Sequence, residues 1–319
     1  MNYLGKVVIK VDLTSRSIRL MGSTISISIL HENADFLLDE VFSLLKIYEN
    51  RFSANDDNSE LMQVNHAAGK EPICVHNDLF ELIELGKKHS LIPGSHLNIT
   101  IGPLIQTWRI GFKDARVPSV SEIEKVLSLT NPENIELDPT ARSVFLKQKG
   151  MKIDLGALAK GYIADKISHF LKEKDVTSAL INLGGNILTI GQNQQNNRLW
   201  RIGIQNPKLP RGNNLALLSI QDQSVVTSGI YERNLKANGK IYHHIFDRNT
   251  GYPIDNQLAS LTIVSDKSVD GEIWTTRLFG ESPSSIIEKV EQENGIEAFV
   301  ITEDNQIFYS SGLTPEILS

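Results

Sequence analysis

Hydrophobic residues recur with two distinct spacings along this chain of 319 residues. Where they return every three or four positions they predict one buried face of a helix, and where they alternate with polar residues they predict a half-buried strand. Helices are predicted at residues 34–51, 77–90, 158–171, 271–280 and 284–294. Strands are predicted at residues 17–30, 179–183, 187–190, 199–205, 215–220, 224–228, 260–264, 297–302 and 306–309.

The predicted strand at residues 17–30 is interrupted by Gly22-Ser23, which indicates a bulge or a close approach of the backbone. Residues 98–112 predict a strand, a turn and a short helix, and another short strand is predicted to start at Met151. Strands and helices do not alternate regularly, so a mixed α+β fold with largely antiparallel sheets and flanking helices is favoured over a doubly wound parallel sheet. A single domain over residues 1–319 is predicted, or two intimate lobes without a visible boundary.

Composition narrows the possible functions. The formal net charge of -6 shows no basic footprint for nucleic acid. The single cysteine, Cys74, excludes a disulfide framework or a zinc cluster within one chain, and its apolar neighbours predict a buried, inert thiol. No apolar run is long enough to span a membrane. The first residues do not resemble a signal peptide, so a cytoplasmic protein is expected if Met1 is the natural start, although a processed exported chain would look the same.

Four glycine-centred segments combine small and polar residues at the edges of predicted strands and helices. They are DLGALAKGYIAD (154–165), NLGGN (182–186), TSGIYER (227–233) and HHIFDRNTGYP (243–253). Glycine lets a backbone approach a phosphorylated ligand closely, although a single segment of this kind is more often a plain turn. Neither the dinucleotide fingerprint nor the Walker phosphate loop is present, so any nucleotide is bound by another design.

Several polar residues are candidates for chemistry. Lys160 lies near the start of a predicted helix, where the helix dipole disfavours a cation, so it is either an exposed lysine without a role or a partner for an anionic ligand. Glu272 and Thr276 lie one turn apart on one helix face, as a plain surface pair or as two oxygen ligands of a hard cation such as magnesium. Asp270 points to another side of that helix.

Two adjacent histidines precede an acidic residue in the last segment. In a strand, His243 and His244 face opposite ways, so only one of them faces a site. A histidine near neutral pH can take a proton from a hydroxyl nucleophile, or it can be a structural residue bonded to the backbone. Asp247 follows three residues later.

Taken together, these segments resemble the ApbE family of FAD:protein FMN transferases, both in the order of the motifs and in their amino-acid sequences. The resemblance runs from about Met21 to Gly312 and includes Arg51-Phe52-Ser53, the Ser59-Glu60-Leu61 element with Asn65, and NITIGPLIQTW at residues 98–108. Asn98 stands where the family usually has an acid. The resemblance implies a magnesium-dependent enzyme that cuts the pyrophosphate of FAD and joins FMN by a phosphoester bond to a threonine or serine of an acceptor flavoprotein.

The resemblance also assigns roles by position. It implies an FAD site lined by Met21, Asp154, Lys160, Asp165, Gly184, Gly185, Asn186, Ser228 and Gly229. It identifies His244 as the catalytic base, with Asp247 orienting it or sharing the task. It places the metal on the Ala157 carbonyl and on the side chains of Glu272 and Thr276. The family usually has aspartate where this chain has Glu272, and the longer side chain leaves the metal geometry open.

Two other functions fit the same residues. An FAD pyrophosphatase would release FMN and AMP, because water can replace the acceptor hydroxyl. A non-catalytic flavin-binding protein is disfavoured, because Lys160, His244, Thr276 and a carboxylate at position 272 are all present. An electron-transferring flavoenzyme has no nicotinamide fingerprint to support it.

Overall fold

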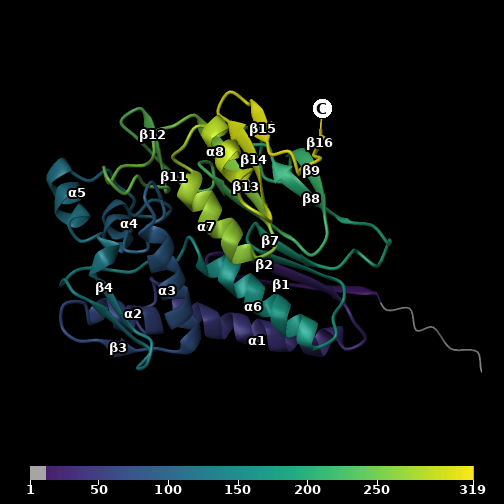
Figure 1. Ribbon diagram of the computed structural model, residues 1–319, viewed down its shortest axis with the longest axis horizontal. Coiled ribbons are helices and arrows are strands. Elements are labelled where there is room, and N and C mark those ends of the chain that lie inside the picture. The colour runs from purple at the N-terminus through teal and green to yellow at the C-terminus, as the bar shows by residue number, and fades with distance from the viewer. Residues whose placement is uncertain (1–11, 319) are drawn as a thin grey trace, which may run out of the picture.

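The computed structural model describes residues 12–318, so the N-terminal residues on which the expected compartment rests lie outside the described residues. An eight-stranded sheet forms the centre of the molecule (Figure 1). Its order is β1 (Leu13–Leu20), β2 (Ser23–Leu30), β6 (Ala179–Leu183), β7 (Asn186–Ile190), β10 (Ser224–Gly229), β13 (Leu258–Ser265), β14 (Ile296–Thr302) and β15 (Ile307–Tyr309). All neighbouring strands in it are antiparallel, which confirms the predicted α+β class.

The interrupted strand predicted at residues 17–30 is in fact a hairpin. β1 pairs with β2 from Leu13↔Leu30 to Leu20↔Ser23, and Met21 and Gly22 form the turn with φ of 51° and 70°. Two positive φ angles match the tight turn that a right-handed twist favours between antiparallel strands. The two strands were predicted as one because hydrophobic and polar residues alternate in the same way on both sides of the turn.

Helices cover the sheet. The long helices α1 (Ala34–Phe52) and α6 (Ala159–Glu173) lie beside each other in Figure 1 and share one hydrophobic cluster with β2, β6 and β7. The helices α7 (Ser268–Leu278) and α8 (Pro283–Val290) are packed with β13 and β14 around a second cluster. The predicted helix at residues 77–90 is α3 (Asn77–Ser90).

Short elements depart most from the sequence prediction. The short helices α2 (Glu60–His66) and α5 (Val120–Leu127) were not predicted, residues 98–112 contain only α4 (Gly102–Trp108), and no strand starts at Met151. Three small sheets complete the fold: β3 (Ile73–Cys74) with β4 (Ile135–Asp138) and β5 (Ser143–Leu146); β8 (Trp200–Gln205) with β9 (Asn214–Ile220) and β16 (Glu316–Ile317); and β11 (Asn234–Ala237) with β12 (Lys240–His243). Strands β8 and β9 match the strands predicted at residues 199–205 and 215–220, whereas the other strands of these sheets are too short to carry a periodic signal.

The prediction of a buried Cys74 was wrong. The cysteine is exposed on β3, whereas the next residue, Val75, is buried. Successive side chains along an extended segment face opposite ways, so an apolar stretch buries only part of its residues.

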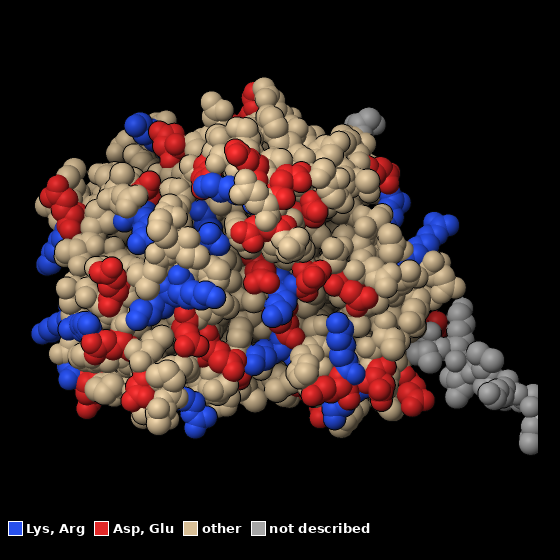
Figure 2. All heavy atoms as spheres, viewed as in Figure 1, with Lys and Arg blue, Asp and Glu red and all other residues tan. Residues whose placement is uncertain are grey.

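Charged side chains of both signs are mixed on the visible surface (Figure 2). None of the helices within residues 12–318 is long and apolar enough to cross a membrane. The prediction of one domain over residues 1–319 stays a prediction.

Candidate active site

Loops and helix ends from four glycine-centred segments meet near one end of the central sheet. The first is the loop before α6. The backbone N–H of Asp154 donates to the Ile99 carbonyl at 2.8 Å, and its side-chain Oδ1 accepts from Gly156 N–H at 2.8 Å. Burial raises the pKa of Asp154, and the Gly156 hydrogen bond and the charge of Arg233 partly offset this rise.

The first turn of α6 brings a lysine and a glycine to the site. A Cβ added at Gly161 would lie 2.5 Å from the Ser268 carbonyl oxygen and 2.7 Å from Cγ of Glu272, so only glycine lets α6 and α7 approach this closely. The charge of Lys160 partly offsets the burial-driven rise in the pKa of Glu272 and adds slightly to the lowering of the pKa of His244.

Asp165 holds α7 in place. Its Oδ1 accepts from Ser268 N–H at 2.7 Å and its Oδ2 accepts from Val269 N–H at 2.9 Å, at the start of that helix. Burial raises the pKa of Asp165 to about 6, although both hydrogen bonds favour the ionised form. Because both oxygens are engaged at a helix end, this placement gives Asp165 a structural role and does not show a direct FAD contact.

The second glycine segment forms the turn between β6 and β7. Gly184 and Gly185 have φ of 69° and 104°, and a Cβ on Gly184 would lie 2.3 Å from Oγ of Ser23. The turn therefore packs against the β1–β2 turn, where Met21 N–H donates to the Glu49 carboxylate at 2.7 Å. Met21 thus lies in the turn next to Ser23, which the glycine turn contacts, and its contact with the flavin stays a prediction.

A buried polar network follows this turn. Nδ2 of Asn186 donates to Oε1 of Glu272 at 2.9 Å, and Oδ1 of Asn186 accepts from Oγ of Ser268 at 2.7 Å. Oγ of Ser224 lies 2.9 Å from Oγ of Ser268. Asn186 is therefore a structural link between β7, β10 and α7, with its side chain only 3% exposed.

Glu272 is buried, not part of a surface pair. It is 8% exposed, and burial raises the pKa of its carboxyl group, with Lys160 and the hydrogen bonds from Asn186 and Gly161 partly offsetting the rise. A buried carboxylate bonded mainly to neutral groups is a favourable place for a cation. Thr276 lies one turn further on the same helix, and Ala157 lies just before α6. Among residues 12–318 no cluster of three His, Cys, Asp or Glu side chains forms a metal site, and the predicted set contains only one such side chain.

The third segment ends β10. Ser228 and Gly229 pair with Leu261 and Ser260 of β13, and a Cβ at Gly229 would lie 2.7 Å from the ring of Tyr231. Ser228 is half-buried. The segment therefore lies at the edge of the site with its backbone close to an aromatic ring.

The two histidines have different surroundings. His243 ends β12, is 8% exposed, and donates from Nε2 to the Ile254 carbonyl at 2.8 Å, while its Nδ1 accepts from Ile245 N–H at 3.2 Å. His244 follows the strand and is half-buried, with Nδ1 3.3 Å from the Arg233 carbonyl oxygen. Burial, together with the charges of Arg233 and Lys160, lowers the pKa of His244 to about 4.

Asp247 shapes the turn after the histidines. Its Oδ1 accepts from the backbone N–H groups of Asn249 at 2.6 Å and Thr250 at 3.0 Å. No hydrogen bond joins Asp247 to His244 among the described residues. The structure therefore brings the two residues into one loop but does not support the idea that Asp247 orients the imidazole.

The sequence matches the family model described as "ApbE family" over residues 21–300. The chain belongs to the ApbE family. It is 43% identical to an FAD:protein FMN transferase of Klebsiella pneumoniae (strain 342) over 297 residues, which cover 93% of this chain and 92% of the relative. A second FAD:protein FMN transferase, from Treponema pallidum (strain Nichols), is 33% identical over 88% of this chain and 81% of its own length.

Solved structures of ApbE proteins share the fold. The ApbE protein of Thermotoga maritima superposes with a TM-score of 0.86 at 24% identity, covering 94% of this chain and 97% of that chain. The flavin transferase ApbE of Vibrio cholerae superposes with a TM-score of 0.82 at 24% identity, covering 95% and 98%. The ApbE-like fold inferred from the motifs is thus confirmed.

Sequence reasoning overlooked two residues that contact the segments around His244. Trp108 donates from Nε1 to the Gly251 carbonyl at 2.9 Å and packs its ring against Tyr242, Phe246 and Tyr252. Arg233 provides the carbonyl that meets His244. Both residues lie inside motifs quoted above, but neither was taken as a candidate site residue there.

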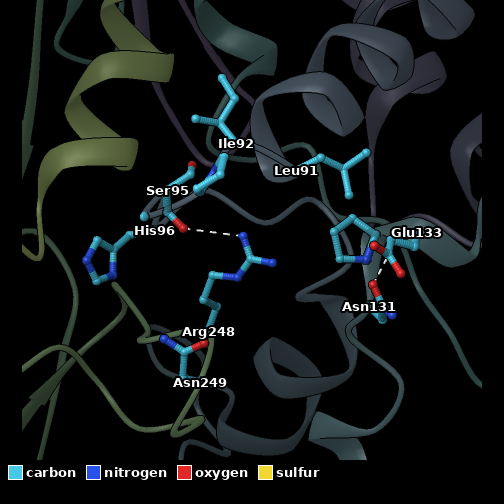
Figure 3. Close-up of a pocket in the computed structure, with 11 residues that line it drawn as sticks. Leu91, Ile92, Ser95, His96, Asn131, Glu133, Arg248 and Asn249 are labelled. Carbon is cyan, nitrogen blue, oxygen red and sulfur yellow. Dashed lines mark hydrogen bonds between the residues drawn. The ribbon is translucent and has the colours of Figure 1, made fainter.

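A separate cavity lies beside the turn that follows His244. Its volume is about 320 Å³, and Figure 3 shows the Arg248 side chain extending into it. Nη1 of Arg248 donates to the carbonyls of Ser90 at 2.5 Å and Ser95 at 3.3 Å, so this arginine ties the turn to the loop after α3. The cavity contains none of the predicted site residues.

Proposed function

We propose that the chain uses this site to transfer FMN from FAD to a threonine or serine hydroxyl of an acceptor flavoprotein, with release of AMP. FAD:protein FMN transferase is the activity named for the relatives at 43% and 33% identity. Within the structure, the observation that supports the proposal best is the position of the His244 imidazole, which lies close enough to Lys160 for that charge to lower its pKa.

The hydrogen bond of His244 suits it to act as a base. A carbonyl oxygen only accepts, so Nδ1 of His244 carries the proton that is donated to Arg233, and Nε2 keeps its lone pair. With a pKa of about 4, the free imidazole is neutral at pH 7. Nε2 takes the proton of the acceptor hydroxyl, the oxygen bonds to the phosphorus of the FMN half, and the bond from that phosphorus to the oxygen of AMP breaks.

Positive charge would lie beside the pyrophosphate. Helix α6 has no side-chain cap at its N-terminus, although the N–H of Ala159 donates to the Leu155 carbonyl and the N–H of Gly161 donates to the Glu272 carboxylate, so the positive end of the helix dipole would favour an anion here. Lys160 extends from that first turn. Gly156, Gly184 and Gly185 allow a ligand to approach the backbone, because they have no side chain in the way.

Magnesium fits the oxygen ligands that these helices offer. The Glu272 carboxylate, the Thr276 hydroxyl and the Ala157 carbonyl would hold it together with phosphate oxygens, because magnesium prefers oxygen ligands and shares its coordination with substrate phosphates. When bound, the ion would neutralise charge that develops on the phosphates. The position of Glu272 supports this set, because burial raises the pKa of its carboxyl group and a bound cation would stabilise the ionised form.

The test is incubation of the protein with FAD and magnesium, with and without a flavoprotein encoded beside it in the genome. Transfer predicts an increase in the mass of the acceptor by one FMN and release of AMP only when acceptor is present. AMP release at the same rate without acceptor would identify an FAD pyrophosphatase. Binding of FAD with no AMP in either mixture would indicate a flavin-binding protein.

A further inference from the structure

The backbone of Arg233 lies beside His244, the proposed base. It follows the TSGI segment and immediately precedes β11, and its carbonyl oxygen lies 3.3 Å from Nδ1 of His244. No role was assigned to its side chain by the family motifs. The side chain is exposed, so it can reach a ligand without leaving a buried position.

The stem of Arg233 lies close to a glycine from a distant segment. A Cβ added at Gly111, which has a φ of 90°, would lie 3.0 Å from Cδ of Arg233 and 3.4 Å from its Cγ. Glycine therefore both permits the backbone conformation and leaves room for the stem. A side chain at position 111 would therefore crowd the stem of Arg233.

The guanidinium group has no ionic partner among residues 12–318. No carboxylate lies within 4.0 Å of it, and the neighbouring Glu232 is 4.0 Å from Arg211 instead. Asp154 is near enough to sense the charge of Arg233 without forming an ion pair with it. An arginine that lies beside a base and lacks a counter-ion is suited to an anion.

We infer that Arg233 contacts the pyrophosphate of FAD and, with Lys160, carries the positive charge that meets the transferred phosphoryl group beside His244. This inference rests on the proposed function. The guanidinium fork matches two phosphate oxygens at once, which lysine cannot do. Arg233 would thus be a catalytic residue in addition to those implied by the motifs.

The test compares Arg233→Gln with wild-type protein, in the presence of magnesium, by calorimetry with FAD and by competition of riboflavin against FAD. Riboflavin has the same ring system but no phosphate. The affinity for FAD is expected to fall about 10- to 100-fold, the usual loss for one charged hydrogen bond, while riboflavin affinity is unchanged. Arg201→Gln is the control, because Arg201 is also exposed but is paired with Glu316 on another sheet.

Unchanged FAD affinity in Arg233→Gln would overturn the inference. An equal loss of affinity for FAD and riboflavin would also overturn it, because the substitution would then act on the shape of the site. An equal loss in Arg201→Gln would mean that net charge alone is responsible. A wild-type protein that fails to bind FAD would instead contradict the proposed function, which keeps the two failures distinct.

Discussion

On one side of the site, α6, α7 and the Gly184–Gly185 turn bury their polar groups, whereas on the other side the β11–β12 hairpin and the following turn present theirs to solvent. Asn186, Ser268 and Glu272 are 3%, 0% and 8% exposed, and they are bonded to one another. Arg233 is exposed and His244 half-buried, and each has few partners. The buried side is therefore fixed by its own hydrogen bonds, whereas the side chains of Arg233 and His244 on the open side are accessible to a ligand.

The largest effect is expected on the open side. His244→Ala should lower the rate of FMN transfer by about 100-fold or more, because a base acts mainly in the transition state. FAD affinity should change little. The measurement is mass spectrometry of the acceptor at saturating FAD and magnesium, and a near wild-type rate would remove His244 as the base.

His243→Ala is the matched comparison. His243 joins the Ile254 carbonyl to the Ile245 N–H, so its loss should reduce the free energy of unfolding by about 1–3 kcal/mol while most activity per folded molecule remains. Denaturant unfolding and the same transfer assay separate the two effects. A loss of activity as large as in His244→Ala would mean that the two histidines do not divide structure and chemistry.

On the buried side, Glu272→Gln should lower transfer at least about 10-fold and raise the magnesium concentration required. Glutamine still accepts the hydrogen bond from Asn186 but lacks the charge that holds a cation. Asp270→Asn is the control and should be much milder. Glu272→Ala also removes a buried hydrogen-bond partner and should lower stability, so it is the less informative variant. Magnesium titrations that are identical for Glu272→Gln and wild type would exclude this ligand.

A smaller effect is expected at Asp165, which holds α7. Asp165→Asn should cost about 1–2 kcal/mol of unfolding free energy at pH 7, because one of two backbone N–H groups loses its acceptor. The folded pKa of Asp165 is raised to about 6, so between pH 4 and 6 the native state holds more protons on this group than the unfolded state. Its contribution to stability is therefore full below about pH 4 and decreases as pH rises through 6. Denaturant unfolding of both proteins from pH 4 to 7 tests this, and a difference that grows with pH would contradict it.

The smallest expected change is a shift in the pH profile. Because the pKa of His244 is about 4 in the free protein, the acid limb of kcat/KM should lie near pH 4 and not at the usual 6.5. The limb of kcat should lie higher, because bound pyrophosphate brings negative charge to the imidazole. Arg233→Gln should raise the kcat/KM limb. Limbs at 6.5 in both profiles would show that burial and the neighbouring cations do not act on the base.

Long periodic segments and ordered motifs were predictable from the chain. The helix at residues 77–90 and the strand at 179–183 match the structure, because their hydrophobic faces pack against the core without depending on rare backbone angles. The hairpin at residues 13–30 was misread, because alternation does not record where a strand reverses. Cys74 was misread because local composition does not give the direction of a side chain.

The sequence by itself determined the family, the order of the motifs and the types of side chain available for chemistry. Only the tertiary structure decided which of them have partners. Both oxygens of Asp165 accept hydrogen bonds from α7, and Asp247 accepts hydrogen bonds within its own turn. Within residues 12–318, Arg233 has no counter-ion beside His244. Hydrogen bonds between residues far apart in the chain depend on the three-dimensional approach of helices and turns, for which the local pattern carries no signal.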